Sequence, residues 1–272
     1  MDRKIGIIGY GSMGRMLVEK FMDSQCVSAK DLLVANRTFE KIVHLKDKCT
    51  VCESNREATK EADIVFLCVR PVDMKDILLE IKEHIKEDSL LVSLNGSIMF
   101  EQIEQICKGK IAKAIPSVTA EVNQSQTLVC YNEQVTDADK ECLTGLLSCM
   151  GMVIELPEHE MGMGSELVSC MPGFIAAIFQ ELCESAKKHT SLSESQIARM
   201  VLHTMEGTGT LMLEKEYSFE DVISRVATKG GITEEGTKVI QEQFPVVADD
   251  VFEKTLEKRR QTTEKARESF EG

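Results

Sequence analysis

The chain has 272 residues, of which 43% are hydrophobic, and its formal net charge is −13. This apolar fraction is typical of a chain with a packed core and excludes an intrinsically disordered protein. The excess of acidic residues argues against a long basic groove for nucleic acid, so no nucleic-acid partner is expected. The length corresponds to one large domain or two modest ones.

The first half of the chain alternates short apolar runs with amphipathic stretches. Strands are predicted over residues 4–8, 32–35, 64–69, 90–94, 111–115, 127–131 and 152–156. Helices are predicted over residues 13–22, 37–46 and 73–85. A further helix is predicted to follow the strand at residues 90–94 and to run through residue 106. Strands that alternate with helices predict an α/β fold, with a mostly parallel sheet covered by helices on both faces.

The second half of the chain has no predicted strand after residue 161. Helical periodicity covers residues 174–188, 194–213, 219–225, 233–243 and 246–269. The change in pattern near LPEHEMGMG places a domain boundary between residues 159 and 160. We therefore expect a Rossmann-type NADP-binding domain over 1–159 and an all-α substrate and dimerisation domain over 160–272. The amphipathic last helices predict a homodimer or a higher homo-oligomer.

Location and cysteine usage give weaker expectations. A strand-like run begins almost at the start, with no secretory signal before it, and no apolar run approaches the roughly 20 residues of a membrane span. We therefore expect a cytoplasmic protein with no membrane partner. The ten cysteines are expected to be reduced structural thiols. Cys49 and Cys52 form one C-x-x-C without a second pair at zinc-site spacing, so no metal site is predicted.

A glycine-rich loop follows the first predicted strand and opens the first helix. Gly9 permits a tight turn, Gly11 lets the backbone approach a pyrophosphate, and Gly14 lets the helix and the strand pack closely. Free N–H groups and the helix dipole favour anionic phosphates there. The cofactor residues predicted in this loop are Ile8, Gly9, Tyr10, Gly11, Ser12, Met13 and Gly14.

The end of the second predicted strand distinguishes the two nicotinamide cofactors. An NAD site usually has Asp or Glu there, but this chain has Asn36, Arg37 and Thr38. A guanidinium suits a 2′-phosphate, so these residues favour NADP over NAD. The alternative is that Arg37 is only an exposed residue at the start of a helix.

Two further loops are expected at the same edge of the sheet, where ligands of such folds bind. One contains Val69, Arg70 and Pro71, and the other contains Asn95 and Gly96. Either loop alone would be an ordinary turn. Together below a phosphate loop they predict a nicotinamide pocket.

A second glycine pair, Gly230 and Gly231, links two predicted helices. Thr233 is expected to be the N-cap of the following helix. Unhindered N–H groups in this turn would form a concavity for a small carboxylate, and Glu234 and Glu235 are expected to point away from it. An ordinary helix–turn–helix link is the alternative.

These stretches resemble Δ1-pyrroline-5-carboxylate reductase over essentially the whole chain. The first glycine loop, residues 36–38, Asn55 before ADIVFLCVRP, and residues 69–71 are similar to the cofactor positions of that family. VATKGGIT with Gly236 resembles its C-terminal signature. The resemblance implies reduction of the cyclic imine to L-proline with NADPH or NADH. It also implies that Thr233 bonds the substrate and that the backbone of Thr228, Gly230 and Gly231 holds its carboxylate.

The chain departs from the family pattern at three places. Ser117 to Thr119 follow Pro116, Ser169 to Met171 precede Pro172, and Lys229 replaces a proline of the signature. These changes resemble the late-competence ComER branch. The alternative function is therefore a catalytically weak or inactive NADP-binding regulator. A β-hydroxyacid dehydrogenase is disfavoured, because residues 161–186 contain no lysine.

Overall fold

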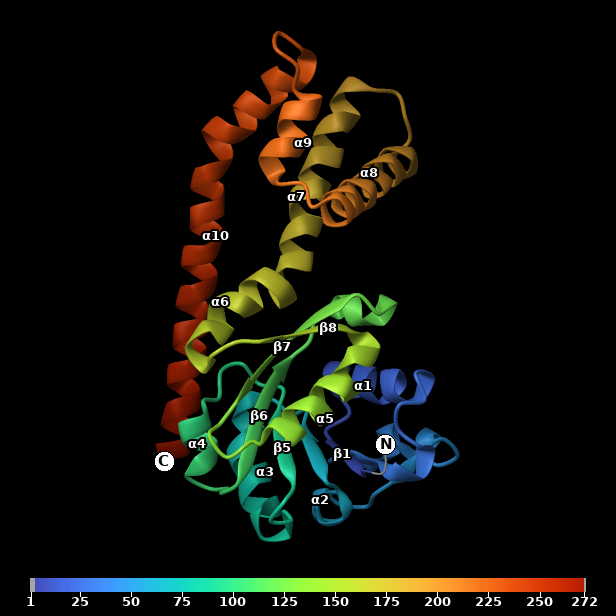
Figure 1. Ribbon diagram of the computed structural model, residues 1–272, viewed down its shortest axis with the longest axis vertical. Coiled ribbons are helices and arrows are strands. Elements are labelled where there is room, and N and C mark those ends of the chain that lie inside the picture. The colour runs from blue at the N-terminus through green and yellow to red at the C-terminus, as the bar shows by residue number, and fades with distance from the viewer. Residues whose placement is uncertain (1–2, 272) are drawn as a thin grey trace. The chain divides into compact units, whose positions relative to one another are not determined.

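The computed structural model describes residues 3–271, which form two compact units (Figure 1). The first unit runs up to Met171 and resumes from Leu256, and the second comprises Pro172–Thr255. The two compact units divide after Met171. The domain boundary that the sequence predicts between residues 159 and 160 stays a prediction. The last turns of the final helix belong to the first unit, which the sequence did not indicate.

The first unit is built on one eight-stranded sheet. Its order is β3-β2-β1-β4-β5-β6-β7-β8, and every neighbouring pair is parallel except β6 with β7. The strands are β1 (Ile5–Ile8), β2 (Leu32–Ala35), β3 (Thr50–Val51), β4 (Ile64–Leu67), β5 (Leu90–Ser93), β6 (Lys110–Ile115), β7 (Ser125–Tyr131) and β8 (Gly151–Glu155). This arrangement confirms the predicted α/β class. The strands β1, β2, β4 and β5 are buried along their whole length, as parallel strands covered on both faces should be.

Helices cover both faces of this sheet. They are α1 (Ser12–Asp23), α2 (Asn55–Glu61), α3 (Met74–Ile81), α4 (Phe100–Glu104), α5 (Asp137–Leu147) and α6 (Met161–Ser165). One core cluster joins α1 and α5 to the sheet, and another joins α3, α4 and the end of the last helix to the opposite face. Phe270 and Ala266 are the buried side chains through which that last helix packs on the first unit.

The second unit is helical throughout, as expected. It contains most of α7 (Met171–Ala186), with α8 (Glu194–Lys215), α9 (Phe219–Val226) and the first part of α10 (Ile232–Glu271). Ser193 and Ser218 accept hydrogen bonds from backbone N–H groups three residues on, so capping boxes begin α8 and α9. Among residues 172–255 only Ile197 is buried in the single chain.

Three expectations about secondary structure and composition are wrong. Residues 37–46 form two short 3-10 turns, Phe39–Lys41 and Val43–Leu45, through which Ile42 and Leu45 are buried and Phe39 packs against the core. The helices predicted over 233–243 and 246–269 are one helix, α10, which continues through Pro245. Proline removes one backbone hydrogen bond there without ending the helix. Finally, the helical stretch Glu158–His189 is long and apolar enough to cross a membrane by composition, although no such run was expected.

Candidate functional site

The first glycine loop has the geometry of a dinucleotide-binding turn. Gly9 has a φ of +98°, and a Cβ there would lie 2.6 Å from the carbonyl oxygen of Cys68. A Cβ on Gly14 would collide with the carbonyl oxygen of Gly9, whereas one on Gly11 would meet nothing within 4 Å. Two glycines are thus required by packing, and the third leaves open space where a phosphate would approach.

Hydrogen bonds fix the loop to the end of β2. The N–H of Gly9 donates to Ala35 O at 2.9 Å, and the N–H of Tyr10 donates to Asn36 Oδ1 at 2.9 Å. The amide of Asn36 in turn donates to Thr38 O at 2.8 Å. Asn36 therefore positions the glycine loop and the residues after β2 together, which is a structural role that the sequence did not reveal.

Arg37 and Arg70 come from different loops and meet at Asp73. Arg37 Nη1 lies 3.3 Å from Asp73 Oδ1, and Arg70 Nε lies 2.8 Å from Asp73 Oδ2. The hydrogen bonds and charge of Arg70, with the charge of Arg37, hold the pKa of Asp73 below its usual value. Both guanidinium groups are largely exposed, so one carboxylate holds two cations at the edge where a 2′-phosphate would bind.

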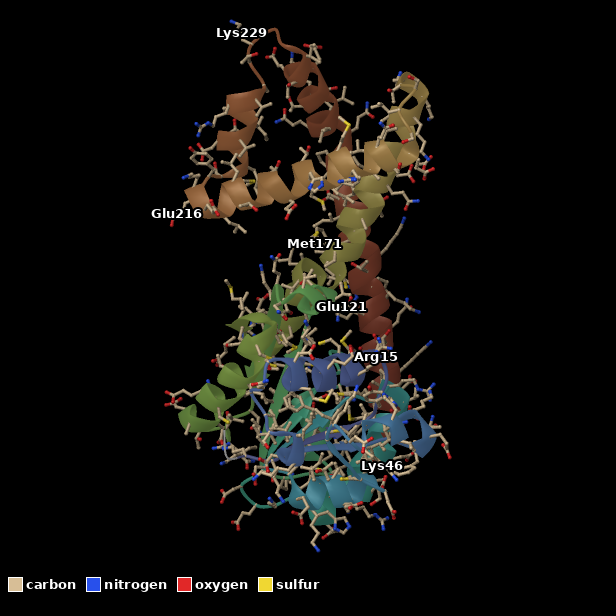
Figure 2. The ribbon with its side chains drawn as sticks, turned by 90° about the vertical axis from the view of Figure 1, so that its right-hand side faces the viewer. Arg15, Lys46, Glu121, Met171, Glu216 and Lys229 are labelled. Carbon is tan, nitrogen blue, oxygen red and sulfur yellow. The ribbon has the colours of Figure 1, made fainter. Side chains whose placement is uncertain are left out.

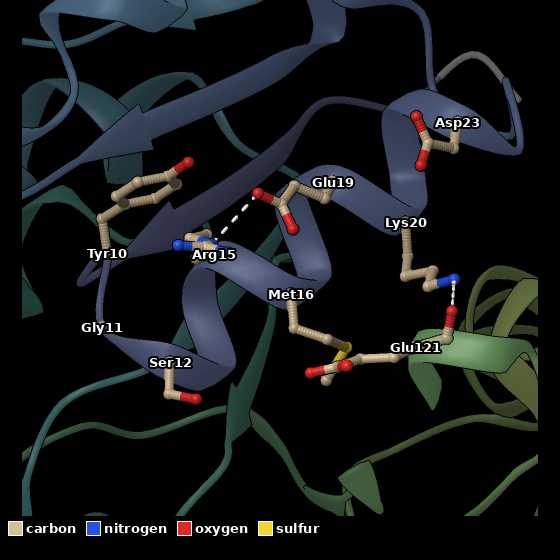
Figure 3. A pocket seen from close by; sticks show the side chains of 9 residues that line it. All are labelled: Tyr10, Gly11, Ser12, Arg15, Met16, Glu19, Lys20, Asp23 and Glu121. Atoms are coloured by element: carbon tan, nitrogen blue, oxygen red, sulfur yellow. Dashed lines mark hydrogen bonds and ion pairs between the residues drawn. The ribbon is translucent and has the colours of Figure 1, made fainter. Parts of the chain in front are cut away.

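A cavity of about 690 Å³ opens beside the glycine loop along α1 (Figure 3). Tyr10, Gly11 and Ser12 line one end of it, and Lys20 reaches from α1 to the carbonyl oxygen of Glu121 at 2.8 Å at the other. Arg15 lies between these ends and is paired with Glu19 at 3.1 Å. This cavity gives the N-terminal end of α1 its access to solvent.

The remaining predicted cofactor residues lie near the same edge. Since β1, β4 and β5 are parallel and in register, their carboxyl ends place Gly9, Val69 and Asn95 along one side of the sheet. Pro71 begins the short turn Pro71–Asp73, which brings Asp73 to the arginines. Asn95 is buried and accepts a hydrogen bond from Ser97 N at 2.9 Å. The side-chain amide of Asn55, another predicted cofactor residue, donates a hydrogen bond to Glu80 Oε2 at 2.9 Å.

The second glycine turn lies in the helical unit between α9 and α10, with Lys229 at its tip (Figure 2). Gly230 has a φ of +75°, and Gly231 N–H donates to Thr228 O at 2.8 Å. A Cβ on Gly231 would lie 2.7 Å from Thr228 Oγ1, so both glycines are required by the turn.

Two expectations about this turn are wrong. The turn leads directly into α10 at Ile232, so Thr233 lies within the first helical turn and is not the N-cap. The Glu234 carboxylate does not point away, because its Oε2 accepts a hydrogen bond from Gly230 N–H at 2.7 Å. A glutamate three residues into a helix commonly bonds back to the backbone before it. The contact also shows that Gly230 N–H can donate a hydrogen bond to a carboxylate oxygen.

A buried ion pair lies near the loop that follows β5. Glu166, which is 1% exposed, belongs to a π-helical turn at Glu166–Cys170, and its Oε1 accepts bonds from Arg259 Nε and Nη2 at 3.1 and 2.7 Å. Glu166 Oε2 is buried without a hydrogen-bond partner among the described residues. A Cβ on Gly96 would lie 3.4 Å from Arg259 Nη1. Sequence patterns could not identify this pair, because its members are 93 residues apart.

A hydrogen bond joins one departure from the family pattern to the residue that precedes another. Ser169 Oγ donates to Pro116 O at 2.6 Å, and Ser117 N–H donates to Ser125 Oγ at 3.1 Å. Cys170 lies beside Glu166 and Arg259, and burial raises the pKa of its thiol, as does Glu166. The altered stretches at Ser117 and Ser169 are therefore neighbours in the fold.

Two family models match separate parts of the chain. One is described as "NADP oxidoreductase coenzyme F420-dependent" and matches residues 4–96, and the other is described as "Pyrroline-5-carboxylate reductase dimerisation" and matches residues 158–262. Pyrroline-5-carboxylate reductase 3 of Bacillus subtilis (strain 168) is 34% identical over 264 residues, which cover 96% of this chain and 97% of that protein. The chain belongs to the pyrroline-5-carboxylate reductase family.

Other relatives and solved structures extend this comparison. ComE operon protein 4 of the same B. subtilis strain is 28% identical over 255 residues, covering 93% of each chain. The crystal structure of Plasmodium falciparum pyrroline carboxylate reductase with NADP bound has a TM-score of 0.86 at 21% identity, covering 96% of this chain and 98% of that one. A Coxiella burnetii pyrroline-5-carboxylate reductase has a TM-score of 0.83 at 24% identity, covering 99% of each chain. These structures confirm the fold of a reductase of this family.

Proposed function

We propose that the protein reduces Δ1-pyrroline-5-carboxylate to L-proline with a nicotinamide cofactor, preferring NADPH. The observation that carries this proposal is the full-length similarity to a reductase of that name, together with a glycine loop whose packing suits a dinucleotide. The cytoplasm is the proposed location, as the sequence suggests.

In this proposal the first unit holds the cofactor, which supplies the hydride when bound. The residues of the 8–14 loop bind the pyrophosphate, and Arg37 and Arg70 bind the 2′-phosphate in competition with Asp73. Asn95 and Gly96, with Val69 and Pro71, form the wall for the nicotinamide end, and Asn36, Thr38 and Asn55 complete the cofactor contacts. The two guanidinium groups are the argument for NADPH over NADH.

The helical unit is proposed to hold the substrate. The Thr228 to Gly231 turn takes its carboxylate, which displaces the Glu234 carboxylate from Gly230 N–H. Thr233 hydrogen-bonds the ring. A protonated cyclic imine is already a good electrophile, so position and exclusion of water are the main requirements, and no strong general acid is needed.

We also propose that the helical unit joins copies of this chain as a dimer or a larger homo-oligomer. Its near lack of buried side chains in the single chain and the match to a dimerisation family model support this. The same association would cover the apolar stretch Glu158–His189 without a membrane.

The second candidate is a regulator that binds NADP and lacks turnover. The relation to ComE operon protein 4 and the departures at Ser117 and Ser169, which neighbour each other through Pro116 O, favour it. Titration of purified protein with NADPH, followed by addition of pyrroline-5-carboxylate, distinguishes the two. NADPH binding with turnover supports the reductase, and NADPH binding without turnover at any substrate concentration supports the regulator.

A further inference from the structure

An arginine near the end of α10 reaches the loop that follows β5. Arg259 belongs to the part of α10 that lies in the first unit. A Cβ on Gly96 would lie 3.4 Å from Arg259 Nη1, and a Cβ on Gly162 of α6 would lie 3.4 Å from Arg259 Cδ. Glycines of two separate segments therefore leave room for this side chain to reach the carboxyl end of β5.

The ion pair of Arg259 uses only part of its guanidinium group. Nε and Nη2 both donate to Glu166 Oε1, at 3.1 and 2.7 Å. Nη1, the nitrogen beside Gly96, makes no hydrogen bond within residues 3–271. Because a guanidinium carries N–H donors on every nitrogen, those of Nη1 remain for an acceptor from outside the chain.

The carboxylate of this pair is closed to solvent, whereas the guanidinium is not. The side chain of Glu166 is 1% exposed and that of Arg259 is 22% exposed. Glu166 therefore holds the arginine in place from the buried side, and a ligand can reach the arginine from the other side. Since Glu166 already balances the charge of Arg259, the remaining N–H groups suit a neutral carbonyl oxygen, which needs no further counter-charge.

The order of the strands indicates which end of a dinucleotide lies beside Nη1. The glycine loop follows β1, Arg37 follows β2 on one side of it, and Gly96 follows β5 on the other side. In folds of this kind the pyrophosphate lies at the glycine loop, and the cofactor extends both ways across the carboxyl ends of the strands. With Arg37 at the 2′-phosphate, as proposed above, the nicotinamide end extends over β4 and β5 towards Gly96.

We propose that Arg259 Nη1 donates a hydrogen bond to the carboxamide oxygen of the nicotinamide, and that Glu166 is the positioning residue that holds Arg259 there. This inference rests on the proposed function, because it requires a nicotinamide cofactor in the first unit. A bond to the carboxamide restrains rotation of the ring about its glycosidic bond. Arg259 therefore helps to decide which face of the nicotinamide is presented to the substrate.

Calorimetric titration of the full-length protein with three ligands tests this contact. NADP⁺ carries the carboxamide, its 3-acetylpyridine analogue keeps the carbonyl but lacks the amide nitrogen, and 2′-phospho-ADP-ribose lacks the ring. Glu166→Gln combined with Arg259→Met removes the guanidinium without leaving a buried charge. We expect it to weaken the first two ligands about tenfold and to leave the third unchanged. Arg260→Met, which removes the exposed and paired arginine next in the chain, should leave all three unchanged.

A second variant retains the ion pair. Arg259→Lys keeps a cation beside Glu166 but has no second nitrogen to reach Gly96, so it should also weaken NADP⁺ and its analogue selectively. An equal loss for all three ligands, or no loss, would overturn the inference and leave the proposed function standing. A loss for NADP⁺ alone would place the contact on the amide nitrogen and overturn it as well. Failure of the unaltered protein to bind any of the three would contradict the proposed function, and the inference with it.

Discussion

The two compact units differ most in what becomes of their apolar side chains. The first unit buries two large clusters against the faces of its sheet, whereas the second buries only Ile197 among its residues 172–255. A sheet covered by helices forms a complete core within one chain. Helices with so little buried surface need another protein surface to be stable, so the comparison teaches that only the first unit is self-sufficient.

The exposed apolar side chains of the helical unit indicate where that second surface binds. They are distributed over all its helices and include Ile178, Leu182, Met200, Leu202, Leu211, Leu213, Phe219, Val239, Ile240, Val246 and Val247. Large exposed apolar surfaces mark protein interfaces. The following predictions test whether stability belongs to the first unit and association to the second.

The largest expected effect is on the stability of the first unit. Arg259→Met would leave buried Glu166 without its only ion-pair partner among residues 3–271, at a cost of about 3–5 kcal/mol in the free energy of unfolding. Urea unfolding monitored by circular dichroism measures this. Glu166→Gln combined with Arg259→Met should recover most of the loss. No loss in the single variant would show that the end of α10 is not anchored as described.

The next effect concerns association. Ile240→Glu places a charge on an exposed apolar position of α10 and should weaken the oligomer by about 2 kcal/mol, or about 30-fold in dissociation constant. Light scattering over a dilution series measures it. Leu79→Glu makes the same change at an exposed position of α3 in the first unit and should leave assembly unaltered. If both variants weakened the oligomer equally, the claim that association belongs to the helical unit would be wrong.

The proposal that the first unit holds the cofactor and the helical unit holds the substrate predicts that a change at Thr233 affects substrate binding alone. Thr233→Ala should raise the KM for pyrroline-5-carboxylate about tenfold through the loss of one hydrogen bond to a charged ligand, with NADPH binding nearly unchanged. Thr237→Ala, one turn later on α10, is the matched control, because its hydroxyl bonds Glu234 O within the helix. Equal weakening of substrate and cofactor would contradict the assigned role.

The smallest effect is expected at Arg37, which is highly exposed. Arg37→Ala should weaken NADPH up to about tenfold and leave NADH almost unaffected, because only NADPH carries the 2′-phosphate. Arg267→Ala, another exposed and paired arginine, is the control. Fluorescence titration with each cofactor gives the ratio, and an unaltered cofactor preference would defeat the 2′-phosphate assignment.

Local signals in the sequence were sufficient for most of the fold. Continuous apolar runs identified the strands that are buried on both faces, and the glycine spacing identified the turn after β1. The helix predicted over residues 37–46 is wrong because apolar spacing alone fits a helix there. Two short turns bury Ile42 and Leu45 equally well. Periodicity records which side chains need burial, but not how the backbone achieves it.

The site residues that the sequence missed depend on long-range contacts. Asp73 gains its role only because Arg37 reaches it from another loop, beside Arg70 of its own turn. Outside the candidate site, buried Lys113 looks like an ordinary strand residue in the sequence, but its Nζ lies 3.1 Å from Glu158 Oε1 of another segment. The assignments of Thr233 and of the cofactor loops remain predictions, which the variants above address.

The most direct test of the central claim is to follow NADPH oxidation and proline formation together in one reaction of the purified protein with pyrroline-5-carboxylate. The account predicts saturable turnover, with one L-proline formed for each NADPH consumed. Tight NADPH binding accompanied by no L-proline at saturating substrate would contradict it.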